Sequence, residues 1–224
     1  DLHSFPTRRS SDLRTWKSKA NKIADFFIKQ IKENRTRFFT AAGFTIGFIL
    51  LGGFILLRFQ TVKETSSDRL AAAYMSLMDK NEQEATAHLN SAIVYARNTP
   101  ASYQARLVKA DMMADKKEYG QALELLKETE EKGNPELIKP LALARIIYIY
   151  DQQNDYDNAI LYANEFINKY SDSFLIKDIY SGLARFYLIT EAVEDAKRVY
   201  NEILAKFPAT AEAEKAEKAL QEMK

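Results

Sequence analysis

The chain contains no cysteine. This absence excludes disulfide bonds, thiolate catalysis and attachment of a lipid to an N-terminal cysteine, but it leaves the compartment open because many exported domains lack disulfides. Histidine is also scarce, with only His3 and His88. His88 follows Glu84 by four residues, so the two share a helix face, yet two ligands do not make a metal site. We expect a surface pair there and no metal.

Glycine-rich and nucleophile motifs are missing as well. The 224 residues include only seven glycines, and no phosphate-binding loop, no G-x-S-x-G and no nucleophile placed with a histidine base can be found. Acidic residues are plentiful, but on amphipathic helices they form the expected solvent side. We therefore expect no enzyme and no cofactor. A membrane-anchored enzyme is the less favoured alternative, and it would need a pocket of carboxylates with shifted ionisation.

Charge is absent from one long stretch. Residues 38–57 read FFTAAGFTIGFILLGGFILL, twenty residues without a charged side chain. A helix needs about 20 such residues to cross a hydrocarbon core about 30 Å thick. Arg35 and Arg37 precede the stretch and Arg58 follows it. The pattern predicts a transmembrane helix over 38–57. The alternatives are a buried core helix or the apolar part of a signal peptide, but no small-x-small cleavage site follows.

The charge distribution predicts the orientation of this helix. Residues 14–58 carry nine Lys or Arg and two acidic residues, net +7, whereas residues 59–224 have a net charge of −6. The positive-inside rule places the N-terminal segment in the cytoplasm and the remainder across the membrane, with the span retained as a signal anchor. An acidic outer domain argues against nucleic acid as a partner, while the basic segment suits anionic lipid.

The N-terminal residues fall into two parts. Residues 1–13 read DLHSFPTRRSSDL and resemble the translation of a common sequencing adapter, so we exclude them from fold reasoning and expect the true N-terminus to be missing. Residues 14–37 are predicted to form a basic amphipathic cytoplasmic segment, with Ile23, Phe26, Phe27 and Ile31 at helical spacing. The segment either lies on the leaflet or serves as a solvated lead-in that enforces orientation.

Small residues occur inside the predicted span. Gly43 and Gly47 form a G-x-x-x-G pattern, which lets a second membrane helix approach closely. We therefore hold these two glycines as candidates for a membrane helix contact, and with it a homo-oligomer. Glycine is common in membrane helices for other reasons too.

After a linker over 58–65, residues 66–224 show no strand pattern. Ala, Leu, Glu and Lys dominate, and apolar residues recur every three or four positions, which predicts consecutive helices. Pro100, Gly133-Asn134-Pro135, Ser171-Asp172-Ser173 and Pro208 separate them. The predicted ranges are 66–79, 82–97, 101–116, 118–131, 136–152, 156–169, 174–190, 192–206 and 209–222. The last is expected to cap the array, with Ala213, Ala216, Leu220 and Met223 facing inward.

An internal repeat organises these helices. Ala85, Ala122, Ala159 and Ala196 are each 37 residues apart, which is typical of stacked helix pairs that cross closely at a small residue. The fourth unit resembles a tetratricopeptide repeat through its aromatic, leucine, small and proline positions. The residues concerned are Tyr180, Leu183, Ala184, Tyr187, Ala196, Tyr200, Ile203 and Pro208. The third unit departs from this pattern at Ile147, where a small residue is expected. It also departs at Ala163 and Phe166, where the large and the small residue are exchanged. The period of 37 also exceeds the usual 34.

This resemblance implies a concave surface lined by the first helix of each pair. The candidate protein-binding residues carried over from the repeat register are Gln104, Asp111, Tyr148, Asp151, Asp178 and Arg185. Tyrosines can stack or hydrogen-bond with an extended peptide, and acidic residues can discriminate by charge. The alternative is that Tyr148, in the apolar run 141–150, is a core residue.

Taken together, the predicted fold is all-α, with one N-terminal transmembrane helix and a right-handed α-solenoid of about four tetratricopeptide-like hairpins plus a capping helix. This architecture resembles the ancillary subunit of the bacterial Sec translocon. The resemblance implies a single-pass inner-membrane protein facing the periplasm, which binds the translocon, periplasmic chaperones or exported chains. An envelope-assembly or cell-division scaffold of the repeat-domain type is the other interaction hypothesis.

Overall fold

The computed structural model describes residues 16, 18, 19, 21, 22, 24–26, 28, 29, 32 and 35–223, the side chain of Phe38 excepted. Over these residues the chain is helical without any strand, which confirms the all-α class. Residues 1–13 and three of the four predicted amphipathic residues, Ile23, Phe27 and Ile31, lie outside the described residues. Phe26 is described, and its side chain is exposed. The chain divides into two compact units, Asp1–Gln60 and Thr61–Lys224.

Helix α2, Arg35–Met78, is longer than the sequence suggests. It contains the predicted span, the predicted linker over 58–65 and the first predicted helix of the outer domain, so the backbone of the linker is helical. Hydroxyl groups accommodate the polar stretch because Thr65 Oγ1 donates to the Thr61 carbonyl at 2.9 Å and Ser67 Oγ to the Lys63 carbonyl at 3.1 Å. Such bonds to the carbonyl four residues back let Ser and Thr remain in a helix.

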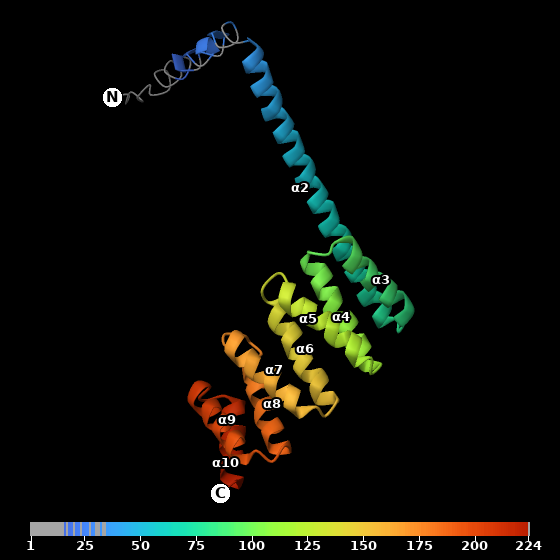
Figure 1. Cartoon of the computed structure of the whole chain (residues 1–224), viewed down its shortest axis with the longest axis vertical. Coiled ribbons are helices and arrows are strands. Elements are labelled where there is room, and N and C mark those ends of the chain that lie inside the picture. The colour runs from blue at the N-terminus through green and yellow to red at the C-terminus, as the bar shows by residue number, and fades with distance from the viewer. Residues whose placement is uncertain are drawn as a thin grey trace, which may run out of the picture. The chain divides into compact units, whose positions relative to one another are not determined.

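Helices α3 to α10 follow α2 in close succession (Figure 1). Each one packs on the next in the sequence, and α4 also packs on α6. Their ends agree with the predicted ranges to within a few residues, and the predicted breakers lie between them. The bounds are α3 Glu82–Tyr95, α4 Pro100–Asp115, α5 Tyr119–Lys132, α6 Ile138–Gln152, α7 Tyr156–Lys169, α8 Ile176–Ile189, α9 Val193–Lys206 and α10 Ala211–Glu222.

The turn that joins two paired helices has the same form at each repeat. Lys80, Lys117, Asn154 and Glu191 are 37 residues apart and all adopt a left-handed backbone, with φ between 56 and 61°. At each turn two backbone N–H groups reach back to the preceding helix, as in Lys117 to Ala114 at 2.9 Å and Glu118 to Met113 at 2.9 Å. This is the Schellman pattern, which satisfies the last carbonyls of a helix. The turns thus repeat with the period seen in the alanines.

Side-chain caps define several helix starts. Asn81, Thr99, Asp155 and Thr210 each accept a hydrogen bond from a backbone N–H three residues on, at 3.2 to 3.3 Å. An Asn, Asp or Thr at this position stabilises the helix start by about 1 kcal/mol. Thr99 also donates to Ser66 Oγ at 3.2 Å, and both side chains are buried. This contact fixes the C-terminal part of α2 to the start of α4.

The core of the second unit lies between successive helices, both within the pairs and between neighbouring pairs. Ala85, Ala122, Ala159 and Ala196 are all fully buried, so the close packing predicted at these positions holds. A large cluster that includes Leu126, Leu143, Phe166 and Leu183 runs through α4 to α10, and a smaller one joins α2, α3 and α4. On α10, Ala213 and Ala216 are buried against α9, while the intervening Glu and Lys residues face solvent as expected.

Candidate functional site

The six predicted groove residues lie on the first helices of three successive pairs. Gln104 and Asp111 are on α4, Tyr148 and Asp151 on α6, and Asp178 and Arg185 on α8. Two ion pairs connect these helices. Together with Arg145, the six residues define what we call the α4–α6–α8 face.

The first ion pair joins α4 and α6. Arg145 Nε lies 2.8 Å from Asp111 Oδ1 and 3.1 Å from Asp111 Oδ2, while Arg145 Nη1 donates to the Leu141 carbonyl at 3.3 Å. Sequence reasoning named Asp111 but missed Arg145. The signal was present, because Asp111 and Arg145 are 34 residues apart in the sequence, as are Asp151 and Arg185.

The second ion pair joins α6 and α8. Arg185 Nη2 donates to Asp151 Oδ2 at 2.6 Å, and the Arg185 guanidinium also stacks over the Phe186 ring at 4.7 Å. Both ion pairs are partly exposed, so each contributes at most about 1 kcal/mol to stability. They leave Asp178 as the charge on the face without a partner among the described residues. The carboxylates of Asp111 and Asp151 already have partners within the chain.

Tyr148 lies between the two ion pairs. It follows Arg145 and precedes Asp151 by three residues, a spacing that places all three on one side of α6. The exposed fraction of Tyr148 is 55%, whereas its neighbours Ile147 and Ile149 are 5% and 1% exposed. The alternative that Tyr148 is a core residue is therefore wrong. Helices α4, α5 and α7 pack on α6. The side of α6 that carries Tyr148 remains accessible to solvent.

Gln104 and Asp178 are exposed on the outer two helices of this face. Within the described part of the chain, neither side chain makes a hydrogen bond or an ion pair. The face thus presents a phenol, an amide and one unpaired carboxylate beside two ion pairs within the chain. Such groups suit recognition by stacking and hydrogen bonding more than by net charge.

The ionisable groups give no sign of acid–base chemistry in the described residues. His88 Nε2 lies 3.7 Å from Glu84 Oε1, the surface pair expected from their spacing, and no group of three metal-ligating side chains occurs there. The pKa shifts found are all upward and belong to Lys or Tyr side chains. Hydrogen bonds with the Tyr162 and Tyr150 hydroxyls raise the pKa of Lys127, for example. Such shifts move groups away from neutral pH, unlike those of general acids and bases.

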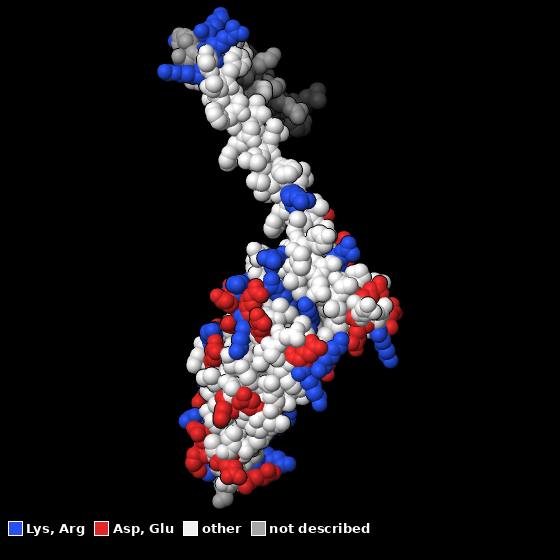
Figure 2. All heavy atoms as spheres, turned by 45° about the vertical axis from the view of Figure 1, so that its right-hand side comes forward, with Lys and Arg blue, Asp and Glu red and all other residues white. Residues whose placement is uncertain are grey.

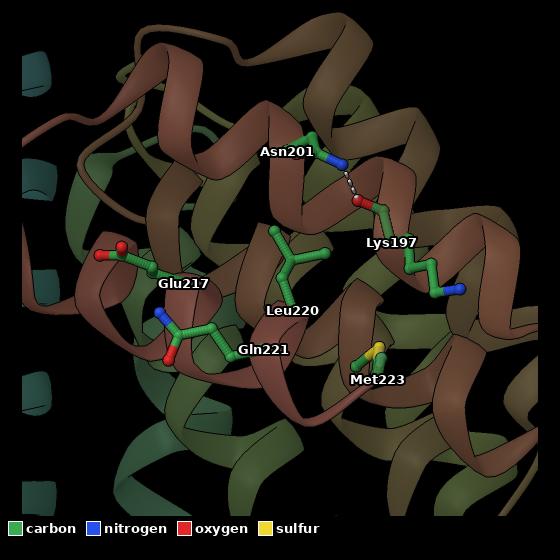
Figure 3. Close-up of a pocket in the computed structure, with 6 residues that line it drawn as sticks. All are labelled: Lys197, Asn201, Glu217, Leu220, Gln221 and Met223. Carbon is green, nitrogen blue, oxygen red and sulfur yellow. Dashed lines mark hydrogen bonds between the residues drawn. The ribbon is translucent and has the colours of Figure 1, made fainter.

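A hollow of about 560 Å³ lies between α9 and α10 (Figure 3). It is lined by Lys197, Asn201, Glu217, Leu220, Gln221 and Met223. Two of these are already engaged, because Asn201 Nδ2 donates to the Lys197 carbonyl at 2.8 Å and Lys197 Nζ lies 3.0 Å from Glu194 Oε1. The lining contains neither a nucleophile with a base nor a metal-ligand set, so its chemistry suggests no reaction.

The apolar stretch of α2 is the second candidate region, within the first unit. It is long and apolar enough to cross a membrane, and none of it is buried inside the described chain. Figure 2 shows it as a stretch of uncharged surface with Lys or Arg at both ends. Gly43 and Gly47 lie in a shallow apolar trough with Phe44, Phe48 and Leu51. A Cβ added at either glycine would meet nothing within 4 Å.

No protein-family model matches the chain, and no curated protein is significantly similar to it. The described residues define a class of protein. It is all-helical, with one apolar helix long enough to span a membrane and a further set of helices in which each packs on the next in the sequence. A functional assignment therefore depends on the chain's own residues.

Proposed function

We propose that this chain is a non-catalytic, membrane-anchored adaptor that binds other polypeptides through the α4–α6–α8 face. The observation that supports the proposal most is Tyr148, an aromatic side chain that is 55% exposed while its neighbours Ile147 and Ile149 are buried. A large exposed aromatic ring on a rigid helix is a common anchor in protein interfaces. The two ion pairs hold α6 against α4 and α8, so the anchor is presented on a fixed surface.

In this proposal the second unit is a right-handed α-solenoid of tetratricopeptide-like hairpins capped by α10. The support comes from three repeating features: the left-handed turn residues, the fully buried alanines and the packing of each helix on the next. Arrays of this kind bind partners along the surface formed by the first helix of each pair. The α4–α6–α8 face is that surface here.

The anchor would be residues 38–57 of α2, crossing the bacterial inner membrane once. The excess of Lys and Arg before the span supports a cytoplasmic N-terminus and a periplasmic second unit. A periplasm-active reporter fused after Lys224 should be active, and a cytosol-active reporter at the same place should not. The opposite pattern, or full-length protein in the supernatant after ultracentrifugation, would remove the membrane proposal.

The partner classes that fit are the Sec translocon, periplasmic chaperones and exported chains in transit. A photo-crosslinker placed at Tyr148 of the full chain in membranes should couple to purified translocon or to an unfolded exported polypeptide. The control position is Leu161 on α7, which is similarly exposed at 60%. Equal coupling from both positions, or none from Tyr148, would count against the face as a binding surface.

Two other functions remain distinguishable from this one. An envelope-assembly or cell-division scaffold would use the same kind of face, and it would co-purify with those assemblies instead of the translocon. A membrane-anchored enzyme would need a pocket of carboxylates with shifted ionisation, whereas the pKa shifts found in the described residues belong to Lys and Tyr side chains.

We further propose that the trough at Gly43 and Gly47 accepts a second membrane helix, giving a homo-oligomer. The support is the open space beside both glycines, since neither is required by a contact within the described chain. Gly43→Leu with Gly47→Leu should lower energy transfer between labelled copies in vesicles, while Gly53→Leu at an equally open position should not.

A further inference from the structure

A cleft of about 490 Å³ lies between two loops of the second unit, separate from the α4–α6–α8 face. One loop joins α5 to α6 and the other joins α7 to α8. The cleft is lined by Leu137 and Pro140 from the first side and by Tyr170 and Phe174 from the second, with Glu136 and Asp172 among them. The helix-pair arrangement brings these loops together although they are about a repeat apart in the sequence.

The cleft combines two exposed apolar side chains. Leu137 is 55% exposed and Phe174 is 63% exposed. Leu137 occupies the N-cap position of α6, where a polar residue is the usual choice, and Phe174 directly precedes Leu175, the N-cap residue of α8; neither helix has a side-chain cap. Exposing a leucine and a phenylalanine in the lining of one concave site indicates a place where apolar surface is covered on binding.

The charges around the cleft are unbalanced toward the negative. Its lining holds two carboxylates, Glu136 and Asp172, and one ammonium group, Lys169, which is already engaged by carboxylates outside the lining. Lys169 Nζ lies 2.6 Å from Glu165 Oε1 and 3.4 Å from Glu130 Oε1, and Lys139 Nζ lies 3.1 Å from Glu136 Oε1. Asp172 is exposed and has no ion-pair partner among the described residues. The lining of the cleft therefore carries a net charge of −1, and the carboxylate without an ion-pair partner is that of Asp172.

Tyr170, in the wall of the cleft, lies near several carboxylates. Its hydroxyl donates to Glu130 Oε1 at 2.7 Å, and its ring packs edge-on against Phe166 with centroids 5.5 Å apart. Burial, the hydrogen bond to Glu130 and the charges of Glu136 and Glu165 all raise the pKa of Tyr170, in that order of importance. Carboxylates on three different segments thus act at one point of the cleft wall.

From this geometry we infer that the cleft between the α5–α6 and α7–α8 loops binds a polypeptide segment that presents an apolar side chain next to Lys or Arg. The apolar side chain covers Leu137 and Phe174, and the cation approaches Asp172 and Glu136. Anionic lipid does not fit because the site is itself negative, and a second copy of the acidic second unit is disfavoured for the same reason. The inference concerns a surface other than the one in the proposed function.

The test uses the full chain in detergent micelles and three labelled hexapeptides of matched length. The first, Ser-Leu-Lys-Phe-Lys-Ser, is apolar and basic. The second replaces both lysines with glutamate, and the third replaces leucine and phenylalanine with serine. Fluorescence anisotropy should show the first peptide binding roughly tenfold more tightly than either of the others, because both the apolar and the charge contacts are needed.

Substitutions then locate the site. Phe174→Ser and Leu137→Ser should each abolish measurable binding of the basic peptide, and Asp172→Asn should weaken it roughly threefold and reduce its salt dependence. Leu161→Ser is the matched control, since it removes an equally exposed leucine from α7 outside the cleft. Circular dichroism of each variant checks that the helices persist.

The outcomes separate this inference from the proposed function. Equal binding of the basic and acidic peptides, or binding that survives Phe174→Ser, would overturn the inference. Binding that is lost with Tyr148→Ala but kept with Phe174→Ser would overturn it too, and would assign the peptide to the α4–α6–α8 face. An oligomer of the full chain that Phe174→Ser converts to a monomer would instead identify a second copy as the occupant.

Discussion

Arg106 Nη1 lies 3.1 Å from Glu128 Oε1, joining α4 to α5, yet the Arg106 side chain is only 7% exposed. Its Nε and Nη1 atoms are buried and make no well-aligned hydrogen bond, so the pair is close in distance but poorly directed. The ring of Tyr103, 5.3 Å from the guanidinium carbon, provides the other favourable contact. The buried cation is thus held by one partly exposed carboxylate and one aromatic face.

Substitutions of Glu128 and of Arg106 should affect the stability of the chain unequally. Glu128→Gln leaves the buried guanidinium without a counter-charge and should lower the free energy of unfolding by about 2 kcal/mol. Arg106→Met removes the unsatisfied donors and should be neutral or stabilising. Urea unfolding of the full chain in micelles, followed by circular dichroism, measures both. Lys132→Gln, which removes only an exposed partner of Glu128 at 3.8 Å, is the control and should change little.

The left-handed turn residues predict a stabilising substitution. Lys117 and Glu191 carry a side chain at a backbone conformation that favours glycine. Lys117→Gly and Glu191→Gly should each raise the free energy of unfolding by about 0.5 kcal/mol. Asn154→Gly should gain less, because asparagine already tolerates this conformation. Equal gains at all three positions would show that the backbone strain is not the cause.

The buried alanines predict a steric effect. Ala159 is fully buried, so Ala159→Leu forces a larger side chain into a packed site. The substitution should destabilise the second unit by about 3 kcal/mol. The same substitution at Ala87, which is exposed on α3, should change stability by less than about 0.5 kcal/mol. Thermal unfolding of the two variants provides the comparison. A similar small effect at both positions would contradict close packing at the alanine.

The raised pKa of Tyr170 predicts that the stability of the chain depends on pH in the alkaline range. Its pKa is higher in the folded chain than the ordinary value of 10.0, so the folded state holds the proton more tightly. The resulting stability is present below pH 10 and is lost as pH rises through the folded pKa. Tyr170→Phe keeps the ring but removes the hydroxyl, so its loss of stability between about pH 9 and pH 11 should be smaller than in the parent chain.

Denaturant titrations at several pH values measure this difference. Tyr95→Phe is the matched control because that tyrosine is 68% exposed. A pH profile of Tyr170→Phe that coincides with the parent profile would show that other groups cause the alkaline loss.

The sequence predicted the helices well because their apolar periodicity and breakers are local signals. The positions of α3 to α10 follow from them, and the spacing of Ala85 to Ala196 located the buried contact between paired helices. The continuity of α2 was missed, because polar residues between Thr61 and Ser67 look like a connector in a linear reading. Their hydroxyl bonds to backbone carbonyls, and the burial of Ser66, become visible only in three dimensions.

The candidate face was predicted only in part. The repeat register found Asp151 and Arg185 without indicating that they pair, and it missed Arg145 altogether. The exposure of Tyr148 could not be read from its sequence neighbours, since an apolar helix does not reveal which of its sides the other helices cover. Pairing across helices depends on tertiary packing, which a single sequence specifies but does not display.

The identical turns at Lys117 and Asn154 have a consequence for how this gene can change in length. Joining Lys117 directly to Asp155 would delete 37 residues, yet α4 would still end in the same turn and α7 would still begin at a capping Asp. Ala159 would then occupy the place of Ala122. Recombination between such turns can shorten or extend the array by one whole unit while the turn at the new junction keeps its form.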